Sequence, residues 1–292
     1  MKFDELDERM RVFETAHDYC VLPGIFMVAR LDGRGFTRLT KEVHNFESPY
    51  DLRFRDMMVD TAEALLVEFN AIYAYTQSDE ISLLFPLSCD LFKRKLRKLN
   101  SVLAGYASAK FALNLGHMAS LDCRICELPS PRYVVDYFRW RNEDAHRNAL
   151  NAHCYWLLRR QGLDGGKASE SLMKLSVAEK NELLFQHGIN FNALPSWQKR
   201  GCGVYREEYQ KEGFNPITRE PAFAARRRIK KDLELPMKDA YSEFVARLID
   251  HDLAARGETP ARRRAVDFTR DRGGEAMSIR CNTRSFDNEE PA

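Results

Sequence analysis

Apolar runs and amphipathic stretches alternate along the first 130 residues. Short, β-rich apolar runs indicate strands, and a periodicity of 3.6 residues indicates helices. In chain order these are a helix at 1–17, a strand at 25–29, a helix at 51–69, a hairpin of 71–75 with 81–85, a helix at 90–115 and a strand at 120–128. The order after the first helix predicts an α+β fold: a ferredoxin-like βαββαβ antiparallel sheet with helices on one face.

Beyond Pro129 the pattern becomes mainly helical. The expected elements are one long helix or two at 134–161, two helices within 167–186, a loop at 190–203, a peripheral hairpin of 204–214 with 225–233 and a helix at 242–255. Periodicity is lost after residue 257. We therefore expect a catalytic domain at 1–130, a helical and hairpin extension at 131–256 and a flexible tail at 257–292.

Composition places the chain among folded proteins. Of its 292 residues 44% are hydrophobic and 30% are charged, and 45 basic against 43 acidic residues give a net charge of +2. This excludes disorder along the whole chain. No run of 18 apolar residues occurs, the N-terminus is acidic, and the seven cysteines are scattered. We expect a cytoplasmic protein without a membrane span or a secretory signal.

Two aspartates occupy matching places in the predicted sheet. Asp32 comes where the first strand ends, and Asp79 lies in the centre of the hairpin. The strand and the hairpin are neighbours in a βαββαβ sheet, so both carboxylates converge at one end, where hard oxygen ligands suit Mg²⁺. The alternative is that each aspartate only ends or turns its strand. Glu80 alternates with Asp79 and is expected to face away, as a supporting contact or a solvated charge.

Two basic runs could bind phosphates. The first, 93–98, includes Arg94, Lys95 and Lys98 and is a triphosphate or RNA-backbone patch if it borders the carboxylates; otherwise it is a solvated helix face. The second, 226–231, includes Arg227 and Lys230 and is either a nucleic-acid groove or ordinary surface.

Residues 139–146 interleave aromatic and basic side chains, which suits base stacking, although such aromatics are more often core. A single Cys-x-x-Cys, Cys123 to Cys126, has no partner at zinc spacing, so we reject a metal site there.

Several segments together resemble the tRNA-histidine guanylyltransferase superfamily, which includes the Thg1-like 3′–5′ polymerases, over roughly residues 5 to 205. Each segment alone is unspecific, whereas their joint order and spacing are highly specific. They are Arg30-Leu-Asp-Gly-Arg-Gly-Phe36, His44-Asn-Phe46, Gln77-Ser-Asp-Glu80, Phe92-Lys-Arg94, Tyr137-Phe-Arg-Trp-Arg141, Asp144-Ala-His146 and Lys180-Asn-Glu-Leu-Leu-Phe185.

The resemblance implies a polymerase-like palm domain that works in reverse direction. Family enzymes activate a tRNA 5′-monophosphate with ATP or GTP, and the 3′-hydroxyl of an incoming NTP then attacks the 5′ phosphorus. It implies two Mg²⁺ ions held by Asp32, Asp79 and the Gly33 carbonyl, and a homo-oligomer, commonly a tetramer, with tRNA crossing subunits. Implied nucleotide contacts are Arg30, Arg34, His44, Ser78, Arg94, Lys95 and Lys98; implied tRNA contacts are His146 and Lys180. Arg227 and Lys230 are expected to contact tRNA because they belong to the basic run 226–231.

Two departures from the family pattern bear on substrate choice. The basic residue expected before His44 is Val43 here, and the nearby Lys41 is not equivalent. The eukaryotic signature His-Ile-Asn-Asn-Leu-Tyr-Asn-Thr keeps only its first, third and fifth positions in 146–153. We therefore expect the Thg1-like branch, which repairs 5′-truncated tRNAs by template-directed addition.

Three other functions stay open at this point. The first is strict addition of G to tRNA-histidine. The second is a non-catalytic RNA-binding module, against which the Asp32 and Asp79 pair and the missing RRM signature argue. The third is a nucleotide cyclase, against which the helical segment after Pro131 argues.

Overall fold

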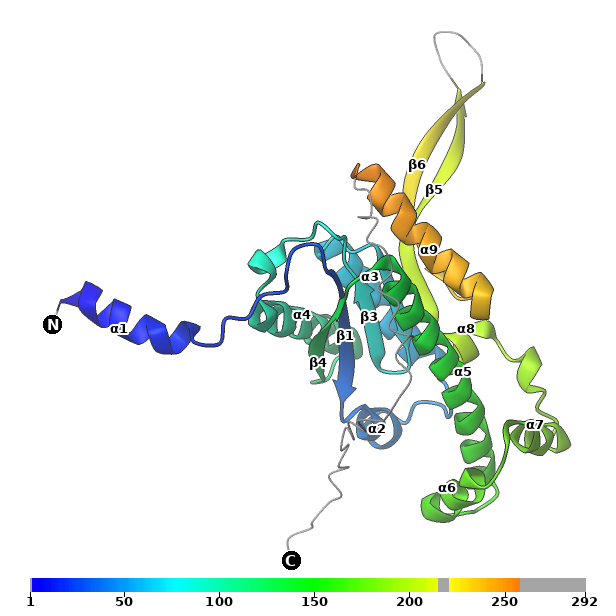
Figure 1. Ribbon diagram of the computed structural model, residues 1–292. Helices are drawn as coiled ribbons and strands as arrows, with labels where there is room; N and C mark the ends of the chain where they lie inside the picture. The colour runs from blue at the N-terminus through cyan, green and yellow to red at the C-terminus, as the bar shows by residue number, and fades with distance from the viewer. Residues whose placement is uncertain (1, 215–220, 258–292) are drawn as a thin grey trace, which may run out of the picture. The chain divides into compact units, whose positions relative to one another are not determined.

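An antiparallel sheet forms the centre of the computed structural model, which describes residues 2–214 and 221–257 (Figure 1). In this part of the chain the strand order is β4-β1-β3-β2-β5-β6. The strands are β1 (Phe26–Arg34), β2 (Tyr73–Gln77), β3 (Glu80–Leu84), β4 (Ser120–Leu128), β5 (Cys202–Phe214) and β6 (Pro221–Asp232). The first four form the predicted βαββαβ sheet, and the α+β fold class is confirmed.

The helices agree with the predicted pattern, with two exceptions described below. They are α1 (Phe3–Thr15), α2 (Phe36–Arg38), α3 (Leu52–Glu68), α4 (Leu96–Leu115), α5 (Pro131–Arg160), α6 (Gly165–Met173), α7 (Val177–Gln186), α8 (Ser196–Arg200) and α9 (Lys238–Ala255). A π-helical turn at Leu39–Val43 and 3₁₀ turns at Leu91–Arg94 and Phe191–Ala193 connect them. Capping residues set several starts: Asp51 accepts from the Arg53 N–H at 2.7 Å before α3, and Ser176 forms a capping box before α7.

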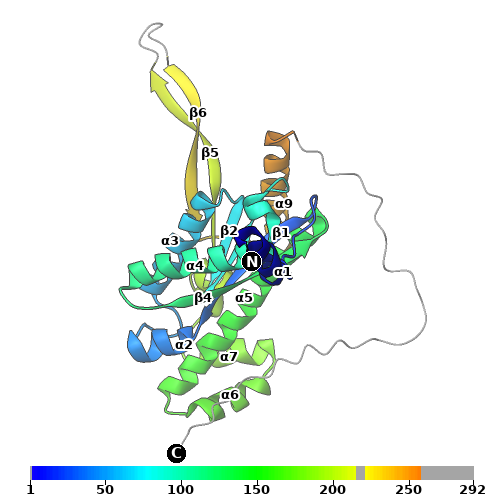
Figure 2. The ribbon, with the colours of Figure 1, turned by 90° about the vertical axis from the view of Figure 1, so that its left-hand side faces the viewer.

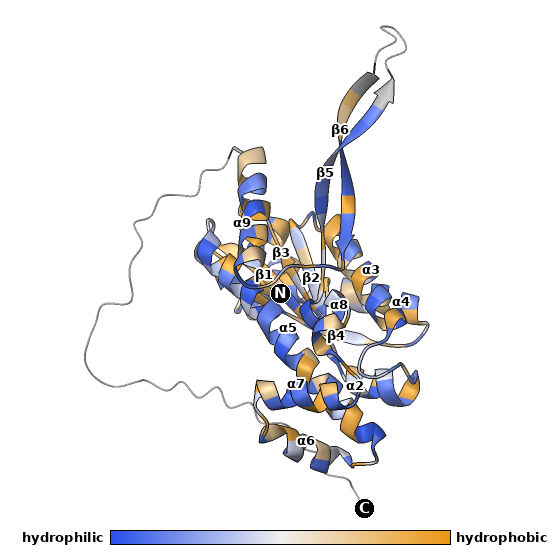
Figure 3. Cartoon of the chain, turned by 90° about the vertical axis from the view of Figure 1, so that its right-hand side faces the viewer, coloured by the Kyte–Doolittle hydropathy of each residue, from blue (hydrophilic) through white to orange (hydrophobic). Residues whose placement is uncertain are grey.

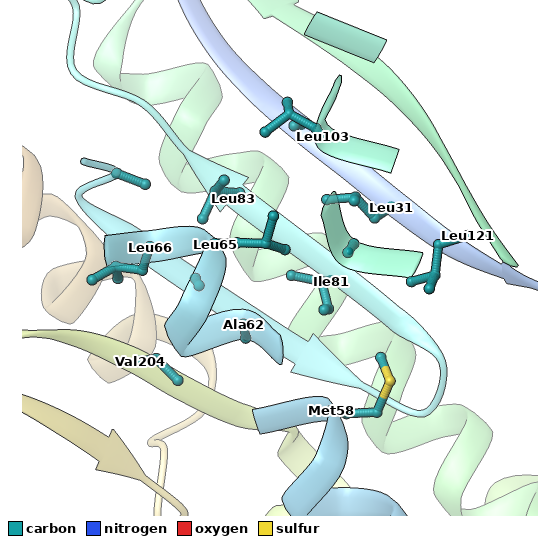
Figure 4. Close-up of a cluster of buried hydrophobic side chains, with 14 of the residues drawn as sticks. Leu31, Met58, Ala62, Leu65, Leu66, Ile81, Leu83, Leu103, Leu121 and Val204 are labelled. Carbon is teal, nitrogen blue, oxygen red and sulfur yellow. The ribbon is translucent and has the colours of Figure 1, made fainter. Parts of the chain in front are cut away.

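One face of the sheet packs against α3 and α4. Leu31, Ile81 and Leu83 point from β1 and β3 towards Leu65 of α3 and Leu103 of α4 (Figure 4). These side chains are fully buried. Burying a leucine or isoleucine contributes roughly 1.5–3 kcal/mol, so this layer anchors the strands that carry the two aspartates.

The other face packs against α5 and α9, which belong to the predicted C-terminal extension, while α3 and α4, the two helices of the βαββαβ unit, lie on one face as expected. Tyr73 and Tyr75 of β2 lie there with Phe138 of α5 and Tyr241 of α9. The two buried hydroxyls of Tyr73 and Tyr241 are 3.0 Å apart and form a hydrogen bond. The central strands are apolar on both faces, which requires a second helical layer.

Two local predictions were wrong. The segment 190–203 is not a continuous loop, because it contains α8, whose Trp197 is buried. The helix expected at 90–115 begins only at Leu96, because Phe92 and Lys93 have positive φ angles. The hairpin of β5 with β6 forms as predicted but is not separate from the core sheet, since β5 pairs with β2.

Helices α6 and α7 pack beside the C-terminal half of α5 around a third apolar cluster (Figure 2). The described residues, 2–214 and 221–257, cluster as one compact unit. The domain boundary expected at residue 130 stays a prediction. Of the predicted tail at 257–292, residues 258–292 lie outside the described part of the chain. No helix in the described ranges has the length and apolar character needed to cross a membrane.

Candidate active site

Asp32 and Asp79 lie on adjoining segments of the sheet. Asp32 is within β1, opposite Glu80 of β3 and Asp122 of β4. The strand thus runs five residues past the end predicted at residue 29 and includes Asp32. Asp79 occupies the two-residue turn between β2 and β3, after Ser78, whose φ of 53° lies in the left-handed region. A positive φ is unfavourable for serine, so this turn is held by its surroundings.

Gly33 brings the turn against β1. Its N–H donates to the Asp79 carbonyl over 3.1 Å. A Cβ atom at position 33 would lie 2.9 Å from the Asp79 Cβ and 2.5 Å from the Phe36 ring. The N–H and C=O of one strand residue point to the same side, so the Gly33 carbonyl also faces the turn.

The two carboxylates influence each other. Burial raises the pKa of Asp79, and the negative charge of Asp32 raises it further. The Asp32 side chain is 33% exposed. Two like charges at a partly buried edge favour a cation.

The donor set fits Mg²⁺. Two carboxylates and a carbonyl are hard oxygen donors, and Mg²⁺ is commonly held by one or two carboxylates together with substrate phosphates. Within 2–214 and 221–257 no cluster of three or more His, Cys, Asp or Glu residues has metal-site geometry.

Glu80 is buried and forms ion pairs with two arginines, Arg30 and Arg141. Its carboxylate accepts from Arg141 Nε and Nη2 of α5 at 2.7 and 2.8 Å. Arg30 Nη2 lies 2.5 Å from Glu80 Oε2 and 3.3 Å from Asp32 Oδ2. Glu80 is therefore not a solvated charge: it is buried, lies across from Asp32 in the neighbouring strand and shares Arg30 with it.

An aromatic cavity of about 390 Å³ opens beside the turn. Ser78 and Asp79 form part of its wall. The remaining wall comes from α2, the π-helical turn, the segment 46–51, α3, β2, α5, α8 and the start of β5. It includes Thr40, Lys41, Phe46, Tyr50, Asp51, Phe54, Tyr155, Trp156 and Trp197. Its size and lining suit a planar heterocycle, and its position puts such a ligand next to Asp79.

Lys41 is the cation of this cavity wall that sequence reasoning set aside. Its Nζ lies 5.3 Å from the centre of the Trp156 ring and donates to the Glu47 carbonyl at 3.1 Å. Burial lowers the pKa of Lys41, while Asp51 opposes that change. Val43, at the expected basic position, is 45% exposed. The π-helical turn, which sequence periodicity does not reveal, fixes how these residues are placed.

The basic run 93–98 does not form one helical face. Arg94 is buried and donates to the carbonyls of Val21, Ile25 and Cys89 at 3.1, 2.6 and 2.6 Å. Such contacts make it a structural residue of the loop before α4. Lys95 pairs with Asp18, and Lys98 is exposed on α4.

The other expected nucleotide contacts divide by location. Arg30 belongs to the Glu80 network, and Ser78 lines the cavity. Arg34 is exposed at the end of β1. His44 is half-buried, stacks on Phe46 with ring centres 5.7 Å apart and leaves its Nε2 without a hydrogen bond to any described residue.

The expected tRNA contacts lie on two parts of the C-terminal half. His146 packs edge-on against Phe191 at 5.3 Å, and Lys180 lines a second cavity beside Trp156. Arg227 and Lys230 are on β6, in the hydrophilic hairpin seen in Figure 3.

The hairpin cations already have anionic partners on the same molecule. Arg227 pairs with Glu208 at 2.7 Å. Arg228 and Lys230 both pair with Glu207, at 2.7 and 3.1 Å. The run 226–231 is therefore less positive than its sequence indicates.

Sequence reasoning missed the cavity wall and Arg141. The signal for Arg141 was present in the motif 137–141 and in the inward orientation of Glu80, which requires a partner when buried. The cavity residues are scattered through the chain, so no motif groups them.

Comparison with known proteins agrees with this geometry. The family model "tRNAHis guanylyltransferase" matches residues 7–130, and the model "Thg1 C terminal domain" matches 132–243. The tRNA(His) guanylyltransferase of Debaryomyces hansenii is 31% identical over 229 residues, which are 73% of this chain and 86% of that protein. The Neurospora crassa enzyme is 36% identical over 69% of this chain and 74% of its own length.

Solved structures give the same result. A bacterial tRNA(His) guanylyltransferase (Thg1)-like protein in complex with GTP superposes with a TM-score of 0.64 at 28% identity, over 84% of this chain and 99% of that one. The corresponding complex with ATP gives 0.66 at 27% identity, over 84% and 98%. The matched segments include both aspartates and the helix that carries Arg141. This chain belongs to the tRNA-histidine guanylyltransferase (Thg1) family.

Proposed function

We propose that this chain is a metal-dependent nucleotidyltransferase that adds nucleotides in the 3′–5′ direction to tRNA 5′ ends. Its finer role would be template-directed repair after ATP or GTP activates the 5′ phosphate. The observation that carries the proposal is the backbone hydrogen bond from Gly33, which follows Asp32 in β1, to Asp79, which lines the aromatic cavity. The names of the GTP and ATP complexes of relatives support the nucleotide assignment.

Asp32, Asp79 and the Gly33 carbonyl would hold two Mg²⁺ ions. Such ions lower the pKa of an attacking hydroxyl and neutralise charge on the leaving phosphate. The chain's own contribution is positioning, because phosphoryl transfer needs aligned reactants and fixed charges more than covalent help. The backbone contact between Gly33 and Asp79 supplies that alignment on the protein side.

The cavity would hold the base of a nucleotide, with its phosphates directed to the turn. Aromatic rings such as Trp156 and Phe46 offer stacking surfaces, and Ser78 and Lys41 offer donors. Arg30, Arg34, His44, Lys95 and Lys98 remain proposed contacts for phosphates of this or a second nucleotide. Arg94 would have a structural role instead, because its hydrogen bonds to backbone carbonyls hold the loop before α4.

The tRNA itself would be bound by His146, Lys180, Arg227 and Lys230. Contacts of basic side chains with phosphates position an RNA but carry no sequence information. Base selection would therefore come from pairing with the opposite strand of the tRNA. The altered signature at 146–153 favours this role over strict G addition.

The alternative is addition of G to tRNA-histidine, which the names of the fungal relatives favour. One assay separates the two: labelled tRNAs shortened at the 5′ end are incubated with each NTP and Mg²⁺, with Asp79→Asn as the blank. We expect the NTP complementary to the opposing base to be added, and a changed opposing base to change the preferred NTP. Addition of G alone, restricted to tRNA-histidine and indifferent to the opposing base, would establish the alternative.

We also propose that the chain forms a homo-oligomer, with a tetramer expected from the family. An apolar stripe on α1 that no other described residue covers supports contact with a second copy. Phe3, Leu6, Met10 and Phe13 recur at heptad spacing and are 77%, 39%, 50% and 74% exposed. The first half of α1 is acidic and Arg9 and Arg11 follow, so an antiparallel pair would place opposite charges together.

Light scattering tests this assembly. Phe3→Ser with Phe13→Ser should shift the wild-type mass towards a smaller species, whereas Leu113→Ser, an equally exposed apolar change on α4, should not. A monomeric wild type at assay concentration would contradict the proposal.

A further inference from the structure

A buried ion pair joins the two matched regions of the chain. Glu80 lies in the region 7–130, and Arg141 lies in the region 132–243. Their side chains are 9% and 11% exposed, and two parallel hydrogen bonds of 2.7 and 2.8 Å connect them. Bidentate arginine–carboxylate pairs fix orientation as well as distance.

One nitrogen atom of Arg30 connects the Glu80–Arg141 pair to Asp32 at the candidate metal edge. Nη2 of Arg30 contacts Glu80 Oε2 at 2.5 Å and Asp32 Oδ2 at 3.3 Å. The Nε of Arg30 is buried and has no hydrogen-bond partner among the described residues. The guanidinium of Arg30 is thus held at its Nη2 end by these two carboxylates.

We propose that the Glu80–Arg141 pair positions Asp32 for its cation, by holding Arg30 so that Nη2 fixes one oxygen of the Asp32 carboxylate. This rests on the proposed function, since it assumes that Asp32 binds a metal ion. Glu80 and Arg141 are positioning residues in this arrangement. Helix α5 thereby sets the geometry of the catalytic edge from the opposite region of the chain.

Charge balance explains why Arg141 is needed. With both arginines present, Glu80 shares its charge between them, and Arg30 keeps a contact with Asp32. Without Arg141, the buried Glu80 carboxylate has Arg30 as its remaining cationic partner. A buried charge is strongly unfavourable unless it is paired, so Arg30 turns towards Glu80 and Asp32 loses its donor.

The same contacts argue against Glu80 as a metal ligand. Both of its oxygens accept hydrogen bonds from arginines, and Ser82 Oγ lies 3.4 Å from Oε1. A ligand carboxylate would have to give up these bonds. Partners that hydrogen-bond a metal ligand without touching the metal affect its affinity by roughly 10- to 100-fold.

The test compares Mn²⁺ affinity of the full chain, measured by electron paramagnetic resonance without nucleotide or tRNA. The variants are Glu80→Gln, Arg141→Met and their combination, with melting temperatures taken in EDTA. Arg139→Met is the matched control, because Arg139 lies on the same helix and pairs with Glu143 and Asp239 at the surface. We expect each single variant to bind Mn²⁺ about 10- to 100-fold more weakly, and the combination to be no worse than either.

Arg141→Lys covers the case in which Arg141→Met does not fold. It keeps the charge but loses the bidentate fork, so it should fold and still bind Mn²⁺ more weakly. Wild-type affinity in a folded Arg141 variant would overturn the proposal and leave the pair a structural role. Weak binding by Glu80→Gln alone would overturn it as well, because Glu80 would then be a ligand. If Asp79→Asn binds Mn²⁺ like the wild type, the metal site of the proposed function fails instead.

Discussion

The N–H of Gly33 donates a hydrogen bond to the carbonyl of Asp79 over 3.1 Å, and this bond ties β1 to the β2–β3 turn. The absence of a side chain at Gly33 lets the two backbones approach. This bond fixes the backbone of Asp79 relative to that of β1, which carries Asp32.

Gly33→Ala should disturb this backbone contact. The added methyl group would meet the Phe36 ring at 2.5 Å and Asp79 at 2.9 Å, so one of them must move. We expect a loss of about 1–3 kcal/mol in the free energy of unfolding and at least about a tenfold loss of kcat/KM. Gly105→Ala in α4 is the control: its methyl group meets nothing within 4 Å, and it should stabilise the helix by about 0.5–1 kcal/mol.

Asp79→Asn should abolish nucleotide addition without lowering stability. Burial and the charge of Asp32 both raise the pKa of Asp79, so the folded protein binds this proton more tightly than the unfolded chain does. That contribution is present at low pH and is lost as pH rises through the folded pKa. In EDTA at neutral pH the variant should therefore melt no lower than the wild type, and normal turnover by the folded variant would contradict the metal assignment.

Asp51→Asn, a change in the cavity wall, should lower the free energy of unfolding by an amount that depends on pH. Burial alone would raise the pKa of Asp51, but hydrogen bonds from the Arg53 side chain and from the N–H groups of Glu47 and Arg53 lower it to about 2. The wild type gains about 2 kcal/mol from this group above pH 4 and loses it as pH falls towards 2. Urea unfolding should show a large difference between variant and wild type at pH 7 and a small one near pH 2.

Arg94→Met and Lys98→Met should separate structure from binding within one basic run. Arg94 satisfies buried carbonyls, so its loss should lower the free energy of unfolding by about 3 kcal/mol or more, with an unchanged KM for NTP in the folded enzyme. Lys98 is exposed, so its loss should leave stability within about 0.5 kcal/mol. A raised KM in Lys98→Met alone would place phosphates at α4.

Lys41→Met should raise the KM for the nucleotide. Lys41 is the basic residue in the cavity wall near Trp156, and a charge-assisted contact contributes roughly 1.5–3 kcal/mol, which corresponds to about tenfold or more in kcat/KM. Lys110→Met, an exposed change on α4, is the control. An unchanged KM in the Lys41 variant would leave the lysine as a packing residue of the π-helical turn.

The edge that carries Asp32 and Asp79 was predictable because it depends on topology. The end of the first strand and the turn of the central hairpin are neighbours in any βαββαβ sheet, whatever the conformation of the loops. The first four strands and the long helices were predictable for a different reason, because their apolar periodicity is strong.

The fate of Arg94 was not predictable, because a run of basic residues does not show which member turns inward. Positive φ angles at Phe92 and Lys93 break the expected helix and bury Arg94 beneath the loop. The π-helical turn at Leu39–Val43 likewise changes which side chains reach the cavity. Both depend on backbone conformations that periodicity does not encode.

The ion pairs along the β5–β6 hairpin change how this surface would respond to salt. Free cations that neutralise phosphates contribute about 0.9 each to the slope of log affinity against log salt. Arg227, Arg228 and Lys230 already pair with Glu208 and Glu207, so an RNA would exchange one anion for another and displace fewer bound ions. Binding at the hairpin should thus be flatter with ionic strength than its basic residues suggest, and the long-range attraction that draws an RNA in must come from other surfaces of the protein.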